Sequence, residues 1–139
     1  MTHRLFLDAN VLFTAAHRPQ GKAAFLFQFQ EAPWRLISSA YAIEEARRNL
    51  IAKFPHALAG WPALTEALEL APKPAAPRLP LDLPDKDLPI WAAAQAAHAT
   101  HLLTGDLKDF GPYMNCPQRT AGILIQTVGD YLASWLSPR

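Results

Sequence analysis

Short apolar runs that end on a polar or acidic residue constrain this chain most, because they alternate with segments of helical periodicity. Four such runs are predicted to be buried strands, at residues 4–8, 34–38, 101–104 and 122–125. Helices are predicted for the segments between and after them, at residues 11–16, 22–30, 39–54, 56–68, 88–100 and 127–136. This alternation predicts an α/β fold with a mainly parallel central sheet flanked by helices.

A proline-rich stretch between Pro72 and Pro84 interrupts the alternation. It contains five prolines, a density that excludes a helix and disfavours a central strand. We predict an extended connection there, not a domain boundary, because the flanking pieces are too small to fold alone. Residues 1–139 are therefore expected to form a single domain, which agrees with the length of the chain.

The charges are nearly balanced, with 13 Lys+Arg against 12 Asp+Glu and a formal net charge of +1. A polyanionic ligand would thus have to be met by a local basic patch or by metal, not by the field of the whole molecule. The single cysteine, Cys116, cannot form an internal disulfide, and a lone thiol fits a reducing compartment. With no signal sequence and no apolar run near the roughly 20 residues that span a bilayer, we expect a cytoplasmic protein without membrane contact.

Two of the predicted strands lead directly to an acid, Asp8 after the first and Asp106 after the third. In open parallel sheets, sites form beyond the carboxyl ends of the strands, where the strand order reverses. Acids that are far apart in sequence can thus become neighbours in space. These two acids, and Asp87 before the predicted helix at 88–100, also have purely structural alternatives. Asp8 could end a strand in a turn, Asp106 could belong to a Gly-Asp turn, and Asp87 could cap a helix with Pro89 in its first turn.

Four acidic segments follow one another along the chain. They are Leu-Asp-Ala-Asn-Val-Leu at 7–12, Ala-Ile-Glu-Glu-Ala at 42–46, Asp-Lys-Asp-Leu-Pro-Ile-Trp-Ala-Ala-Ala at 85–94 and Leu-Leu-Thr-Gly-Asp-Leu-Lys-Asp at 102–109. In kind, order and spacing they resemble the PIN-domain family, and in particular the toxin-type (VapC-like) ribonucleases of bacterial toxin–antitoxin systems. The resemblance implies a single PIN-like domain that hydrolyses RNA phosphodiester bonds with Mg²⁺ or Mn²⁺. It also implies an antitoxin protein as a partner and a homodimer.

The resemblance also assigns roles to residues. Asp8, Asp87 and Asp106 match the family's metal-site acids, and a glutamate completes the catalytic set. That glutamate is either Glu44 or Glu45. We prefer Glu45, because its spacing to the following apolar residues is that of the family.

Asn10 and Thr104 match polar positions that line the family's site, and Asp109 matches a fifth, less constant acidic position. The resemblance implies that these three residues contact the substrate. Carboxylates held together in one cleft repel unless a cation neutralises them. Mg²⁺ and Mn²⁺ are hard ions that prefer oxygen ligands and can activate a water for attack on phosphate. No histidine or cysteine set with zinc spacing occurs in the sequence.

Two rival functions remain beside the nuclease. The first is a PIN-like module that binds RNA or protein without cleaving it. The second is a phosphohydrolase of the haloacid-dehalogenase type, which places an Asp after its first strand but needs a second Asp where this chain has Asn10. Among the remaining residues, Arg47 and Arg48 are predicted to lie on a solvated helix face, and His98 and His101 to have surface or capping roles.

Overall fold

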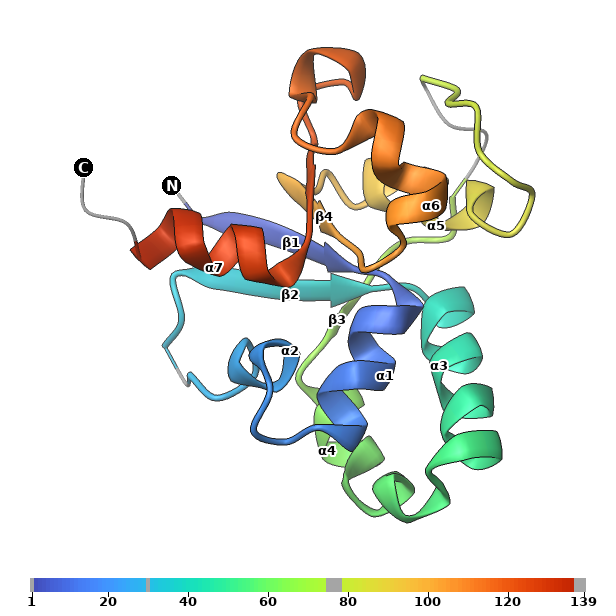
Figure 1. The fold of residues 1–139 in the computed structure, drawn as a ribbon, viewed down its shortest axis with the longest axis vertical. Helices are drawn as coiled ribbons and strands as arrows, with labels where there is room; N and C mark the ends of the chain where they lie inside the picture. Colours follow the sequence, from blue (N-terminus) through green and yellow to red (C-terminus); the bar gives the residue numbers. More distant parts are fainter. Residues whose placement is uncertain (1, 30, 75–78, 137–139) are drawn as a thin grey trace.

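A computed structural model describes residues 2–29, 31–74 and 79–136 and shows helices packed around a central sheet (Figure 1). The strands are β1 His3–Leu7, β2 Trp34–Ser38, β3 Glu69–Leu70, β4 His101–Leu103 and β5 Leu124–Gln126. The α-helices are α1 Ala9–His17, α2 Lys22–Phe25, α3 Ala40–Lys53, α4 Trp61–Glu66, α5 Leu88–Ala96, α6 Leu107–Phe110 and α7 Val128–Leu136. Three short 3₁₀ helices are η1 Pro55–Gly60, η2 Gly111–Tyr113 and η3 Pro117–Arg119.

The five strands form one sheet in the order β3-β2-β1-β4-β5, and every neighbouring pair is parallel. The central strand β1 pairs on both sides, so that Leu5 lies opposite Leu36 of β2 and His101 of β4. Where a strand is buried on both faces its residues have to be apolar, and the buried part of β1, from Leu5 to Leu7, satisfies this. The predicted α/β fold with a parallel sheet is confirmed.

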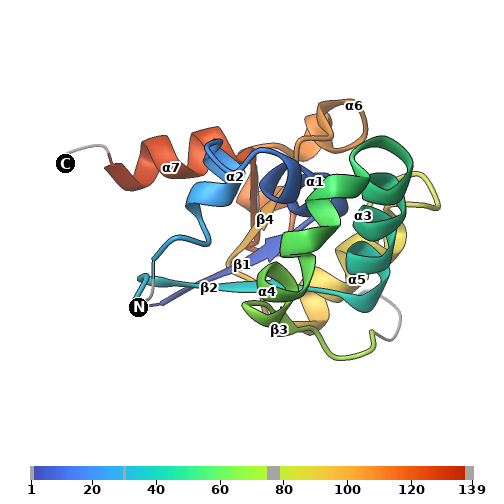
Figure 2. The ribbon, with the colours of Figure 1, turned by 90° about the horizontal axis from the view of Figure 1, so that it is seen from below.

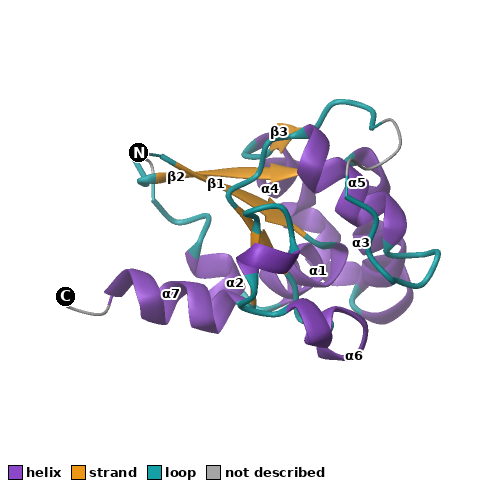
Figure 3. Ribbon diagram, turned by 90° about the horizontal axis from the view of Figure 1, so that it is seen from above, coloured by secondary structure: helices purple, strands orange, loops and turns teal. Residues whose placement is uncertain are grey.

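Helices cover both faces of the sheet. Two neighbouring residues of β1 mark the two faces: His3 is hydrogen-bonded to Tyr131 of α7, whereas the guanidinium of Arg4 donates to the carbonyl of Ala97, just after α5. Figures 2 and 3 show α1, α2 and α7 on the same side of the strands. The connection from β3 to β4 carries α5 to the other side, as a right-handed crossover requires.

The core fills both interfaces between sheet and helices. Its fully buried apolar side chains include Phe6 of β1, Leu12 of α1, Leu50 of α3, Trp91 of α5 and Leu102 of β4. Burying side chains of this size contributes about 1.5 to 3 kcal/mol each. Five elements are thus fixed relative to one another around the ends of β1 and β4.

Three predicted helices end earlier than expected. The helix over 22–30 stops at Phe25, and the indole N–H of Trp34 donates to the carbonyl of Leu26 just beyond it; Gln30 lies outside the described residues. The helix over 56–68 is divided into η1 and α4, because Pro62 has no N–H to continue the ladder. The helix over 88–100 ends at Ala96, and His98 then adopts a positive φ of 53°.

Four short elements were not predicted, because each has only two to four residues, too few to show a period: β3, α6, η2 and η3. The expected surface role of His101 is wrong, because its ring is buried between His3 and Tyr131. In the proline-rich stretch, residues 72–74 and 79–84 form neither helix nor strand, as the prolines predict. Within the described residues, no helix is long and apolar enough to cross a membrane.

Candidate metal centre and cleft

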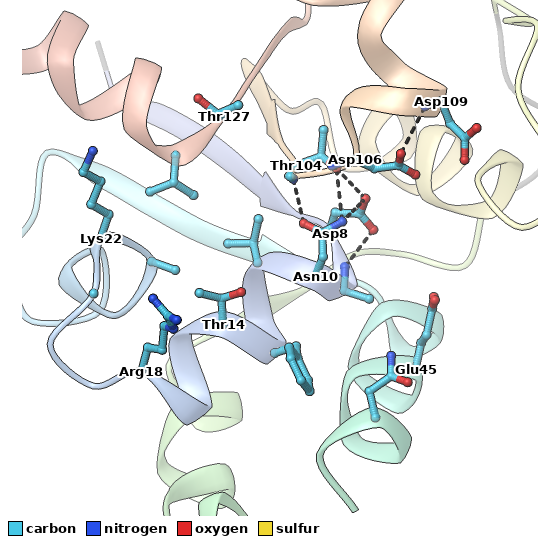
Figure 4. Close-up of a pocket in the computed structure, with 18 of the residues that line it drawn as sticks. Asp8, Asn10, Thr14, Arg18, Lys22, Glu45, Thr104, Asp106, Asp109 and Thr127 are labelled. Carbon is cyan, nitrogen blue, oxygen red and sulfur yellow. Dashed lines mark hydrogen bonds between the residues drawn. The ribbon is translucent and has the colours of Figure 1, made fainter. Parts of the chain in front are cut away.

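The candidate site lies where the strand order reverses. From β1 the chain runs on to β2, whereas from the adjacent β4 it runs on to β5 in the opposite direction. Such a switch point leaves a crevice beyond the carboxyl ends of the two strands. A cleft of about 1020 Å³ opens there (Figure 4). It is lined by all of the predicted site residues: Asp8, Asn10, Glu45, Asp87, Thr104, Asp106 and Asp109.

Asp8 forms the floor of the cleft, directly after β1. Its side chain is only 4% exposed and accepts hydrogen bonds from Ala9 N at 2.7 Å, Thr104 Oγ1 at 2.8 Å and Asn10 Nδ2 at 3.1 Å. Burial raises the pKa of this carboxyl, while the hydrogen bonds from Thr104 and Ala9 act in the opposite direction. The carboxylate also caps α1, so the structural reading of Asp8 holds beside the functional one.

A polar network ties the end of β1 to the end of β4. Asn10 Oδ1 accepts a hydrogen bond from Gly105 N at 2.7 Å, and a Cβ added at position 105 would lie 3.3 Å from that oxygen. The hydroxyl of Thr104 accepts from Asp106 N at 3.0 Å while it donates to Asp8. The Thr-Gly-Asp sequence therefore places Asp106 beside Asp8 through specific contacts.

Three carboxylates, here called the acid triad, gather beside this network: Asp87, Asp106 and Asp109. One carboxylate oxygen from each lies within 4.8 Å of the others. Asp106 and Asp109 belong to one turn, because Asp106 caps α6 by accepting a hydrogen bond from Asp109 N at 3.0 Å. Asp87, at the start of α5, makes no capping bond with its side chain.

Asp87 is the most unusual member of the triad. It is 5% exposed, and its Oδ2 has no hydrogen-bond partner among the described residues. Burial raises the pKa of Asp87 to about 7, with a smaller upward contribution from Asp109 and an opposing one from Lys86. A buried carboxylate oxygen without a donor is costly unless a cation is bound to it.

The triad overlaps with the predicted metal acids Asp8, Asp87 and Asp106 but is not identical to them. Asp109, expected at the substrate, stands with Asp87 and Asp106, whereas the oxygens of Asp8 lie outside the group and are held by three hydrogen bonds. The assignment of individual residues to metal and to substrate stays a prediction.

Lys86 is the site residue that the sequence did not reveal. Its Nζ lies 3.2 Å from Asp109 Oδ2, 3.5 Å from Asp106 Oδ2 and 3.7 Å from Asp87 Oδ2. The hydrogen bond from Lys86 lowers the pKa of Asp109. The one sequence signal is its place between two acids in Asp-Lys-Asp at 85–87.

The two neighbouring glutamates of α3 have different surroundings. Glu44 is bound by Arg47 at 2.6 and 2.9 Å and by Arg48 at 3.3 Å, and the hydrogen bond from Arg47 is the largest cause that lowers its pKa to about 2. Glu45 lines the cleft, and Figure 4 shows its side chain rising from α3 toward the acids. Of the two glutamates only Glu45 lines the cleft, and its catalytic role stays a prediction. The side chains of Arg47 and Arg48 are exposed, as expected.

Besides Lys86, which lies at the acid triad, four basic residues line the same cleft. They are Arg18, Lys22, Lys53 and Lys108. Arg18 and Lys22 lie on the side opposite to Asp109 in Figure 4. The cleft thus combines an acidic centre with a basic margin, an arrangement that suits a polyanion held beside a cation.

Comparison with known proteins places the fold. No protein-family model matches the sequence, and no curated protein matches it. A chain in the structure of VapBC-1 from nontypeable Haemophilus influenzae superposes with a TM-score of 0.58 at 19% identity, over 91% of this chain and 98% of the other. A chain in the structure of VapBC2 from Rickettsia felis, bound to a DNA fragment from its promoter, superposes with a TM-score of 0.65 at 16% identity, over 89% and 98%. The chain has a VapC-like PIN fold.

The acid triad of this PIN fold has the chemistry of a hard-cation site. Three carboxylates from two segments converge, and Oδ2 of Asp87 is buried without a hydrogen-bond partner among the described residues. Mg²⁺ and Mn²⁺ are hard ions that prefer carboxylate oxygens as ligands. These residues therefore fit a divalent cation.

Proposed function

We propose that the chain is a metal-dependent ribonuclease that hydrolyses RNA phosphodiester bonds with Mg²⁺ or Mn²⁺. The observation that carries the proposal is the convergence of the acid triad, with Oδ2 of Asp87 buried without a hydrogen bond, at the switch point of a VapC-like PIN fold. A divalent ion bound there would act as a Lewis acid and lower the pKa of a water for attack on phosphorus.

The chain's own residues have separate tasks in this proposal. Asp87, Asp106 and Asp109 hold the ion, and Asp8 contributes directly or through water. Thr104 and Asn10 keep Asp8 and the loop at Gly105 in place through their hydrogen bonds. Glu45, which lines the cleft from α3, would accept a proton. The basic margin of the cleft contacts the phosphates on either side of the scissile bond.

The resemblance to toxin-type PIN proteins extends the proposal to partners. We propose that residues 1–139 form one PIN-like domain, that it acts as the toxin of a toxin–antitoxin pair, and that an antitoxin silences it by covering the cleft. A homodimer is part of the same proposal, and co-expression with the product of a neighbouring gene tests both assemblies. The cytoplasm is the proposed location, since RNA is there and Cys116 is a free thiol.

Incubation of the purified protein with single-stranded RNA tests the activity. We expect cleavage with Mn²⁺ or Mg²⁺ and none with excess EDTA. The cleavage rate of Asp106→Asn should be lower than that of wild type by at least about 100-fold, which is the upper end of the losses seen when the surroundings of a metal are disturbed. Glu66→Gln, an exposed acid of α4 outside the cleft, is the matched control and should cleave at the wild-type rate. Unimpaired cleavage by Asp106→Asn, or in EDTA, would falsify the proposal.

The rival function, RNA binding without cleavage, has one observation in its favour. Lys86 already brings positive charge to the triad, so the acids could serve as a structural ion-pair network. In that case the protein would bind RNA equally well with and without EDTA. Added metal would neither change the affinity for RNA nor shorten the RNA. The cleavage experiment distinguishes the two functions directly.

A further inference from the structure

Lys86 lies where a second cation would have to bind. Its ammonium is within 4 Å of one carboxylate oxygen from each member of the acid triad. An ion coordinated by the same carboxylates would lie about 2 Å from each oxygen and therefore very near the ammonium. Two cations so close repel strongly in a partly buried site. Lys86 and a divalent ion thus exclude each other at the positions that these contacts define.

The contacts of Lys86 also show how it can give way. Its side chain is 61% exposed, whereas those of Asp87, Asp106 and Asp109 are 7%, 17% and 14% exposed. Its main-chain carbonyl is held by the hydroxyl of Tyr41 at 3.0 Å. The backbone of the residue is therefore tethered to α3, while the long side chain can turn toward solvent at little cost.

We propose that Lys86 is a built-in counter-ion that competes with the divalent cation for the acid triad and so sets the metal concentration at which the site fills. The inference rests on the proposed metal-dependent function. Lys86 neutralises part of the repulsion among the three carboxylates until the ion displaces it. Each of its ion pairs is exposed and weak alone, but the ion has to replace all three.

Lys108 provides a matched control for this inference. It also lines the cleft and is exposed, but among the described residues it forms no ion pair with the triad. Replacing either lysine by methionine changes the net charge equally. A difference between the two variants therefore reports on direct occupation of the triad and not on the general field of the cleft.

Isothermal titration of the whole protein with Mn²⁺ alone, without RNA, tests the inference. We expect Lys86→Met to lower the Kd for Mn²⁺ by about tenfold relative to wild type, as the loss of several weak ion pairs implies. Lys108→Met should change it by less than about threefold, and Lys86→Arg, which keeps the charge, should remain close to wild type. Lys86→Gln repeats the measurement with a polar side chain in case methionine disturbs the loop.

A second readout is the melting temperature. In EDTA, Lys86→Met should melt at a lower temperature than wild type, because the triad has lost its counter-ion. Addition of Mn²⁺ should raise the melting temperature of Lys86→Met by more than that of wild type. If Lys86→Met binds Mn²⁺ no more tightly than wild type does, the inference about Lys86 is overturned and the proposed function is not. If neither wild type nor Lys86→Met binds Mn²⁺, the proposed metal-dependent function fails, and the inference fails with it.

Discussion

At the scale of single residues, Thr104 has the most demanding position in the site. Its buried hydroxyl donates to Asp8 and accepts from Asp106 N. Thr104→Val keeps the shape of the side chain, but the carboxylate of Asp8 and the main-chain N–H of Asp106 each lose a hydrogen-bond partner. We expect a loss of about 1 to 3 kcal/mol in the free energy of unfolding, measured by urea denaturation in EDTA. The affinity for Mn²⁺ should fall by roughly 10- to 100-fold, since both acids lose their orientation.

Thr120 offers a control for that substitution. It too is fully buried, and its hydroxyl donates to the carbonyls of Ile123 and Cys116, outside the cleft. Thr120→Val should cost a similar amount of stability and leave Mn²⁺ affinity unchanged. Equal losses of metal affinity in both variants would show that Thr104 acts only through stability.

Lys22 allows a residue-scale test of the basic margin. Its amine lies in the cleft beside Gly129, where a Cβ would be 3.5 Å from Nζ. If Lys22 contacts a phosphate, Lys22→Gln should weaken RNA binding for all sequences and reduce the slope of log K against log salt by about 0.7 to 1. Fluorescence anisotropy over a salt series, with catalysis blocked by Asp106→Asn, measures both. Lys73→Gln, exposed and outside the cleft, should leave the slope unchanged.

At the scale of elements, the sequence was most informative where an element is long or fully buried. The apolar run of β1 and the capped periodic segment of α3 were predicted within a few residues. The segment from Lys22 has an equally good helical pattern, yet α2 ends after one turn, since the chain must reach β2. That requirement comes from tertiary structure and leaves no local signal. The edge strand β3 has two residues, too few for any alternation.

The same contrast applies to the candidate site. Asp8 and Asp106 could be predicted to meet, because each follows a strand and parallel strands end at one edge. Asp87 was assigned by resemblance to a family motif. Lys86 was not foreseen, because its three contacts depend on how the proline-rich connection returns to the cleft before α5. The path of such a connection is not encoded in a periodic pattern.

Because the ring of His101 packs against Tyr131 of α7, we expect the packing of α7 on the sheet to depend on pH. Burial, with a smaller contribution from His3, lowers the pKa of His101 to about 4. The unfolded chain, with a pKa of about 6.5, therefore binds more protons between pH 6.5 and 4, so stability is lost as the pH falls through that window. We expect a loss of roughly 2 kcal/mol between pH 7 and 5 from this group. His101→Phe, which keeps a ring beside Tyr131, should flatten that part of a urea-denaturation profile; an unchanged profile would contradict the assignment.

At the scale of the whole molecule, a net charge of +1 hides a strongly uneven distribution. Five carboxylates and five basic side chains line one cleft. The carboxylates repel one another while the fold holds them together, so the native state carries a cost that the unfolded chain does not. An ion that binds only the native state offsets that cost by mass action. Metal should therefore act on global stability as well as on activity.

The size of this effect can be predicted. At a free ion concentration 100 times the Kd, binding stabilises the native state by about 2.7 kcal/mol. For a domain of this length, each kcal/mol shifts the melting temperature by roughly 3 to 5 °C. Calorimetry should therefore show a rise of roughly 10 °C when saturating Mn²⁺ replaces EDTA. Glu66→Gln should respond as wild type does.

Asp87→Asn separates the cost of the buried charge from the gain on metal binding. The raised pKa of about 7 means that the native state takes up a proton more readily than the unfolded chain, so the stability linked to that proton is lost as the pH rises from about 4 through 7. In EDTA at pH 8, Asp87→Asn, which carries no charge to desolvate, should therefore melt above wild type. In Mn²⁺ the order should reverse, because only wild type keeps the full triad. A variant that melts below wild type in both conditions would show that Asp87 stabilises the fold as an ordinary partner of Lys86.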